Sequence, residues 1–190
     1  KDGKMNGFSK LYYPNGKLQS EATFKNDIQE GIQKDYHKNG KLSIEMTFKN
    51  GKLDGSYKEY YKGNKPKVTA TYVNGKEEGE YTVYYESGQK QVVSKFKEGL
   101  PEGEWVYYYQ NGKESKKMNF VKGLKDGKQS EYYESGNKKL ESEFKNGKES
   151  GTWTVYFDNG KISTTFSYLD GQLNGPVVIN DDKGVKIVEG

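Results

Sequence analysis

Three kinds of side chain in this chain could take part in chemistry or binding: a single histidine, a row of carboxylates and a row of tyrosines. As a catalytic base, His37 would need a nucleophile and an orienting group close by. The equivalent places 24 residues before and after it hold Tyr13 and Tyr61. Because an aromatic side chain occupies these places, we expect His37 to have a structural role.

The carboxylate row recurs at the same interval and precedes a run of glycines. Ca²⁺ needs several oxygen ligands within about 2.6 Å. Neighbours in this row should lie roughly 10 Å apart if two strands separate them. We therefore expect solvated charges here, with no metal site and no catalytic carboxylate pair. The row consists of Glu30, Asp54, Glu78, Glu102 and Asp126.

The tyrosine row is the candidate interaction face. Tyrosine is amphipathic and enriched in protein interfaces, so a row of these rings could bury against another chain or stack on a glycan. The alternative is that each ring packs over neighbouring lysine stems and stiffens the structure. The row consists of Tyr12, Tyr36, Tyr60, Tyr84, Tyr108, Tyr132 and Tyr156.

The elements that position these rows follow one repeat of 24 residues, marked by eight spaced glycines from Gly7 to Gly175. An array of this kind grows by stacking, so residues 1–190 are predicted to form a single repeat domain. Residues 1–6 would end a preceding repeat, and residues 175–190 would form a partial capping repeat. The full repeats are residues 7–30, 31–54, 55–78, 79–102, 103–126, 127–150 and 151–174.

Within each repeat, apolar and polar residues alternate, as in a strand with one buried face. Residues 43–48 read Ser-Ile-Glu-Met-Thr-Phe, and pairs such as Asn39-Gly40 and Asn50-Gly51 bound the strand. Such pairs favour two-residue hairpin loops. The predicted fold is all-β: an elongated single-layer antiparallel β-meander of about seven and a half β-hairpin repeats.

A two-residue loop at the first turn of each repeat would place each spaced glycine opposite an aromatic residue. We expect the missing glycine side chain to leave room for the opposing ring. The predicted core face combines Gly31, Gly55, Gly79, Gly103, Gly127 and Gly151 with Phe24, Phe48, Tyr72, Phe96, Phe120, Phe144, Tyr168, Trp105 and Trp153.

Composition excludes some classes of function. The net charge is +4, but 31 basic residues, all Lys, are interspersed with 27 acidic ones. Without Arg, the usual bidentate contacts to bases and phosphates are absent, so nucleic acid is not an expected partner. There is no Cys, and no apolar run reaches the roughly 18 residues of a membrane span. The sequence starts at Lys1 rather than Met, so we expect that a signal or anchor could have been removed, which favours export or the cell surface.

The segments Gly103–Lys113, GEWVYYYQNGK, and Gly151–Lys161, GTWTVYFDNGK, resemble the bacterial variant of the MORN repeat. Repeats of this type also occur in proteins labelled as a family of toxin–antitoxin antitoxins. The resemblance implies a twisted single sheet of stacked hairpins that associates with proteins or membranes. It brings no catalytic residue and no cofactor with it.

The function expected from these features is a non-enzymatic scaffold for protein–protein interaction, exported or displayed on a bacterial surface. One alternative is an intracellular antitoxin that binds a cognate toxin protein. Another is binding of membrane lipid or of a glycan through the tyrosines and the neighbouring lysines Lys10, Lys34 and Lys58. The protein partner is unidentified, and the chain could also form a homo-oligomer.

Overall fold

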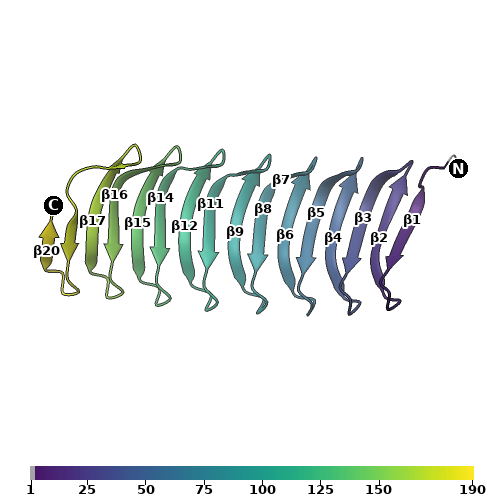
Figure 1. The fold of residues 1–190 in the computed structure, drawn as a ribbon, viewed down its shortest axis with the longest axis horizontal. Coiled ribbons are helices and arrows are strands. Elements are labelled where there is room, and N and C mark those ends of the chain that lie inside the picture. Colours follow the sequence, from purple (N-terminus) through teal and green to yellow (C-terminus); the bar gives the residue numbers. More distant parts are fainter. Residues whose placement is uncertain (1–2) are drawn as a thin grey trace. The chain divides into compact units, whose positions relative to one another are not determined.

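The computed structural model describes residues 3–190, which form twenty β-strands and contain no helix (Figure 1). The chain comprises two compact units. The N-terminal unit consists of residues 3–90 and 96–99, and the C-terminal unit consists of residues 91–95 and 100–190. Within each unit, hydrogen-bonded neighbours run antiparallel, so the predicted all-β antiparallel meander is confirmed.

The strands of the N-terminal unit are β1 (Gly7–Tyr12), β2 (Leu18–Lys25), β3 (Ile28–Tyr36), β4 (Leu42–Lys49), β5 (Lys52–Tyr60), β6 (Pro66–Val73), β7 (Lys76–Glu77) and β8 (Gly79–Tyr84). Strand β9 (Lys90–Lys97) contributes residues to both units. The C-terminal unit contains β10 (Leu100–Pro101), β11 (Gly103–Tyr108), β12 (Glu114–Val121), β13 (Leu124–Lys125), β14 (Gly127–Tyr132), β15 (Lys138–Lys145), β16 (Lys148–Tyr156), β17 (Ile162–Leu169), β18 (Gln172–Leu173), β19 (Val178–Asn180) and β20 (Lys186–Glu189).

The second turn of each repeat has the predicted two-residue loop. In the hairpin of β15 and β16, Lys145 pairs with Lys148. The two loop residues, Asn146 and Gly147, have φ values of 50° and 83°. Two consecutive positive φ angles are the requirement of a type I′ turn, whose twist matches that of the flanking strands.

The first turn of each repeat differs from the prediction, because its loop has three residues. At the turn between β11 and β12, the Tyr109 N–H donates to the Lys113 carbonyl over 2.8 Å, and the Gly112 N–H donates to the Tyr109 carbonyl over 3.0 Å. Only Gly112 has a positive φ, 82°. This is a type I turn followed by a left-handed glycine. The Asn111 side chain accepts the Lys113 N–H over 2.9 Å and holds the loop in this form.

A β-bulge compensates for the longer loop, so the predicted register is nevertheless present. Tyr107 pairs with Lys116, whereas Tyr108 pairs with Glu114, which leaves one extra residue on β12. Beyond the bulge, Gly103 pairs with Phe120. The equivalent pairs elsewhere are Gly7 with Phe24, Gly31 with Phe48, Gly55 with Tyr72, Gly127 with Phe144 and Gly151 with Tyr168.

The backbone geometry of the spaced glycines gives a different reason for their presence from the predicted one. A Cβ atom built on Gly103 would meet no heavy atom within 4 Å, so the Phe120 ring does not require the missing side chain. Gly103 instead has a φ of 67°, in the left-handed region that side chains disfavour. Each such glycine lies at a second bulge: between β15 and β16, Glu143 pairs with Ser150 but Glu141 pairs with Thr154, so residues 151–153 face one residue. The glycines therefore serve a backbone bend, and at Gly55 and Gly151 a Cβ atom would also lie 3.0 Å from Thr47 and 2.7 Å from Glu143.

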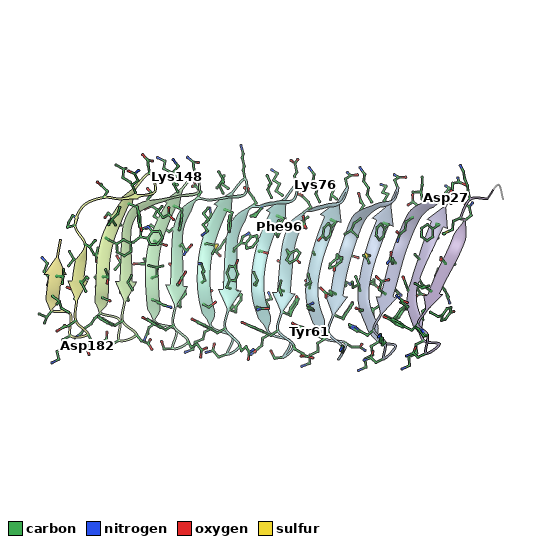
Figure 2. The ribbon with its side chains drawn as sticks, viewed as in Figure 1. Asp27, Tyr61, Lys76, Phe96, Lys148 and Asp182 are labelled. Carbon is green, nitrogen blue, oxygen red and sulfur yellow. The ribbon has the colours of Figure 1, made fainter. Side chains whose placement is uncertain are left out.

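Most buried side chains of each unit lie on the face that carries the paired aromatic rings, called here the aromatic face, whereas Thr82 and Val106 are buried on the opposite face. In the N-terminal unit, the Tyr81 and Phe96 ring centroids lie 5.5 Å apart, and the Phe96 ring is visible against the strands in Figure 2. In the C-terminal unit, Trp105 lies 5.0 Å from Phe120, and Trp153 lies 5.2 Å from Tyr168. A column of smaller or flexible side chains is buried among these rings: Ala22, Ala70, Ser94, Met118 and Ser142.

Candidate interaction surface

The tyrosine row lies on the opposite face, called here the tyrosine face. Alternation along the first strand of each repeat gives this placement, and two hydrogen bonds show it directly. The Tyr36 hydroxyl donates to Glu21 Oε1 over 2.7 Å, and the Tyr156 hydroxyl donates to Glu141 Oε2 over 2.6 Å. Tyr12 is exposed, and the other six rings of the row are half-buried.

These contacts change the acid–base behaviour of both tyrosines. Burial, together with the Glu21 carboxylate that accepts its hydrogen bond, raises the pKa of Tyr36 to about 12. The hydrogen bond to Glu141, together with burial, raises the pKa of Tyr156 to about 12. Donated hydrogen bonds from Lys138 and Tyr156 in turn lower the pKa of Glu141. Both tyrosines are therefore neutral donors, held in place by carboxylates.

Two other members of the row, Tyr108 and Tyr132, line a hollow beside the first turns of the C-terminal unit. The hollow has a volume of about 400 Å³, and Gly112, Lys113, Glu114 and Gly136 complete its lining. The two rings supply apolar surface, while Lys113 and Glu114 supply charges of both signs. This combination suits a mixed apolar and polar segment of another protein.

A second row, for which the sequence predicted no binding role, links one repeat to the next wherever it carries a hydrogen-bond donor. We call it the turn ladder: the sixth residue after a spaced glycine donates to the carbonyl 23 residues further along. Its bonds are Tyr13 to Tyr36 (2.6 Å), Tyr61 to Tyr84 (2.7 Å), Tyr109 to Tyr132 (2.6 Å) and Tyr133 to Tyr156 (2.8 Å). The recurrence of tyrosine at this position is the feature of the sequence that could have indicated this row.

His37 is part of the turn ladder. Its Nε2 atom lies 3.1 Å from the Tyr60 carbonyl, the contact that the repeats with a tyrosine at this position make through the hydroxyl. A carbonyl can only accept, so Nε2 must carry the proton in this contact. His37 therefore acts as a hydrogen-bond donor within the fold, in agreement with the structural role expected for it.

Removing one hydroxyl from the turn ladder tests its contribution to stability. We expect Tyr133→Phe to lower the free energy of unfolding by about 0.5–1.5 kcal/mol, because one intramolecular hydrogen bond is lost while the ring is kept. Urea unfolding followed by fluorescence measures the change. Tyr12→Phe is the matched control, since the Tyr12 hydroxyl makes no hydrogen bond within residues 3–190. If both variants were as stable as the parent chain, the hydroxyl of Tyr133 in the turn ladder would contribute nothing measurable to the free energy of unfolding.

The carboxylate row remains solvent-accessible and also has partners within the fold, which the sequence did not predict. Each carboxylate accepts the N–H of the first loop residue in the next second turn. The Asn50 N–H lies 2.9 Å from Glu30, and the Lys122 N–H lies 2.9 Å from Glu102. The equivalent pairs are Asn74 with Asp54, Glu98 with Glu78 and Asn146 with Asp126. These charge-assisted bonds stabilise turns whose first residue has a positive φ.

Other kinds of site are not evident in the described part of the chain. Among residues 3–190, no group of three or more His, Cys, Asp or Glu side chains could hold a metal ion. In the same range, no helix is long and apolar enough to cross a membrane. What the structure offers are regular surfaces: two faces of strands and two edges of turns in each unit.

Comparison with known proteins identifies the repeat. The family described as "MORN repeat variant" matches the chain seven times, at residues 5–26, 29–50, 53–74, 77–98, 101–122, 125–146 and 149–170. No curated protein matches the chain. The seven matches cover most of the sequence and follow the hairpins seen in the structure. The chain therefore belongs to the MORN repeat variant family.

Proposed function

We propose that this repeat protein is a non-enzymatic scaffold that binds another protein through its tyrosine face. The observation that carries the proposal is the hollow lined by Tyr108 and Tyr132, two members of a row that recurs in every full repeat. Tyrosine offers a large contact area with only two side-chain torsions to immobilise. A half-buried ring of this kind loses little further freedom on binding.

The titratable groups of the fold support a scaffold rather than an enzyme. His37 is bonded to a backbone carbonyl, and Glu30 and Glu102 accept N–H groups of turns. Side chains with such fixed partners stabilise the array and are poorly placed to exchange protons with a substrate. The family match adds that the repeat itself is a structural module. A bacterial cell surface as the site of action stays a prediction from the sequence.

The test of this proposal separates binding from folding. Once a partner has been captured and purified, calorimetry measures its affinity for the parent chain and for Tyr108→Ala combined with Tyr132→Ala. We expect at least a tenfold loss of affinity, since truncating interface tyrosines commonly costs more than 1 kcal/mol. The melting temperature should fall much less.

A control at the opposite turns makes the result specific. Val121 and Leu124 are 43% and 52% exposed beside a second turn of the same unit. We expect Val121→Ala combined with Leu124→Ala to bind the partner as the parent chain does. Unchanged affinity of the tyrosine variant would contradict the proposal. A loss of folding as large as the loss of binding would assign the tyrosines to stability alone.

A further inference from the structure

Three of the four first turns in the N-terminal unit form an edge with charge of one sign, whereas the fourth, at residues 85–89, carries Glu86. Three consecutive turns, at residues 13–17, 37–41 and 61–65, carry lysines but no acidic residue. All five lysines are exposed: Lys17, Lys38, Lys41, Lys62 and Lys65. We call this surface the lysine edge. Figure 2 shows Tyr61, which lies in one of these turns, at the edge away from Lys76, which follows a second turn.

No carboxylate neutralises the lysine edge within residues 3–190. Lys17 Nζ lies 3.0 Å from the Asn39 carbonyl, and Lys65 Nζ lies 3.1 Å from the Ser87 carbonyl, so both ammonium groups contact neutral acceptors. The ion pairs of the described chain involve other lysines: Lys34, Lys67, Lys116, Lys117 and Lys138. The positive charge of the edge is therefore available to a partner.

The same turns of the C-terminal unit do not share this character. Glu134, Asp158 and Asp182 occupy the place that Lys38 and Lys62 hold in the N-terminal unit. Because the hairpin geometry is the same in both units, the turn itself does not require lysine at this place. The local concentration of charge is a property of three repeats only.

A hollow gives the lysine edge a specific shape. It has a volume of about 360 Å³ and is lined by Tyr13, His37, Lys38, Asn39 and Lys62. Lysines from successive turns lie two strands apart, which is about 10 Å. In a polyproline II segment, every third side chain points the same way and advances about 9 Å. Carboxylates at every third residue of such a segment would match the spacing of the lysines.

We propose that the lysine edge binds an extended acidic segment of a protein, with one carboxylate in the hollow between Lys38 and Lys62. The charge complementarity and the matching repeat distance carry this proposal. It adds a second surface to the proposed scaffold function and uses residues separate from Tyr108 and Tyr132. Electrostatic attraction of this kind gives binding that weakens as salt screens the charges.

The probe for this surface is a fluorescent peptide with the sequence (Glu-Pro-Pro)₄, measured by anisotropy at low and high salt. We expect it to bind the parent chain at low salt and to bind Lys38→Gln combined with Lys62→Gln at least fivefold more weakly. The matched control is Lys49→Gln combined with Lys52→Gln, which removes the same charge beside the second turn of the repeat 31–54. Its affinity should stay within twofold of the parent value.

Each other outcome overturns the proposal. If both double variants lost the same affinity for the peptide, the attraction would depend on net charge only. If (Gln-Pro-Pro)₄ bound as tightly as (Glu-Pro-Pro)₄, the carboxylates would not be what the protein recognises. Binding of anionic vesicles or of a sulfated oligosaccharide through Lys38 and Lys62, without peptide binding, would assign the edge to another ligand class. None of these results affects the tyrosine variants, so failure of the lysine edge is distinguishable from failure of the scaffold proposal.

Discussion

Gly103→Val is expected to lower the free energy of unfolding by about 1–3 kcal/mol, measured by urea unfolding. The cause is the backbone: Gly103 has a φ of 67°, and a β-branched side chain is strongly disfavoured there. Crowding at the first side-chain atom does not contribute, because a Cβ atom at this position meets nothing within 4 Å. The variant should therefore unfold more easily even though there is space for its first side-chain atom.

Two companion variants separate backbone strain from crowding. Gly103→Asn should lose less stability than Gly103→Val, since Asn tolerates the left-handed region, as Asn50 does here with a φ of 52°. Adding Phe120→Ala to Gly103→Val should bring no relief, because the ring is not what opposes the side chain. Recovery of stability in that double variant would restore the original explanation and refute the backbone one.

Phe144→Ala is expected to have the largest effect, a loss of about 3–5 kcal/mol. The side chain is only 7% exposed, its ring centroid lies 5.4 Å from that of Trp153, and Lys125 Nζ lies 4.8 Å from the ring. Truncation removes apolar burial, an aromatic pair and a cation–π contact together. Unfolding in urea can be followed by tryptophan fluorescence, since Trp153 reports directly on this contact.

Leu169→Ala is the control for this experiment. Leu169 directly follows Tyr168, the residue that corresponds to Phe144 in the next repeat, but Leu169 is 60% exposed, so its truncation should change stability by less than about 0.5 kcal/mol. If Phe144→Ala lowered the free energy of unfolding as little as Leu169→Ala, packing on the aromatic face would contribute little to the stability of the C-terminal unit. A large loss for Phe144 alone would place the stability of the C-terminal unit on that face.

The strands and their register could be predicted from the sequence because alternation and spacing report them directly. The loop length of the first turn could not, because an Asn-Gly pair suits both a type I′ turn and a type I turn with a left-handed glycine. In the observed form the Asn111 side chain accepts the Lys113 N–H, a contact that residue identity does not reveal. The bulge between Tyr107 and Tyr108 then restored the predicted pairing.

The candidate surface was predictable to a similar degree. Parity along a strand is enough to place Tyr36 on the face opposite the aromatic rings, but not to show that Glu21 accepts its hydroxyl. The turn ladder joins residues 23 positions apart, and the carboxylate row joins residues 20 positions apart. In both cases the bonding partner is a backbone atom. Because almost every residue has the same backbone N–H and carbonyl groups, a sequence pattern does not reveal which of them accept or donate these bonds. A glycine required by φ likewise looks the same as one required by crowding.

The turn ladder has a consequence for how such a protein can change its length. Every rung runs forward, from a side chain in one hairpin to a carbonyl in the next, as from Tyr109 to Tyr132 and from Tyr133 to Tyr156. A duplicated hairpin therefore arrives with its own donor and its own acceptor, and a deleted one removes both. Gain or loss of a whole repeat that carries such a donor leaves no bond of the turn ladder unmade, whereas an insertion of any other size would put donors and acceptors out of step. Evolution can thus lengthen or shorten this protein in whole modules at little energetic cost.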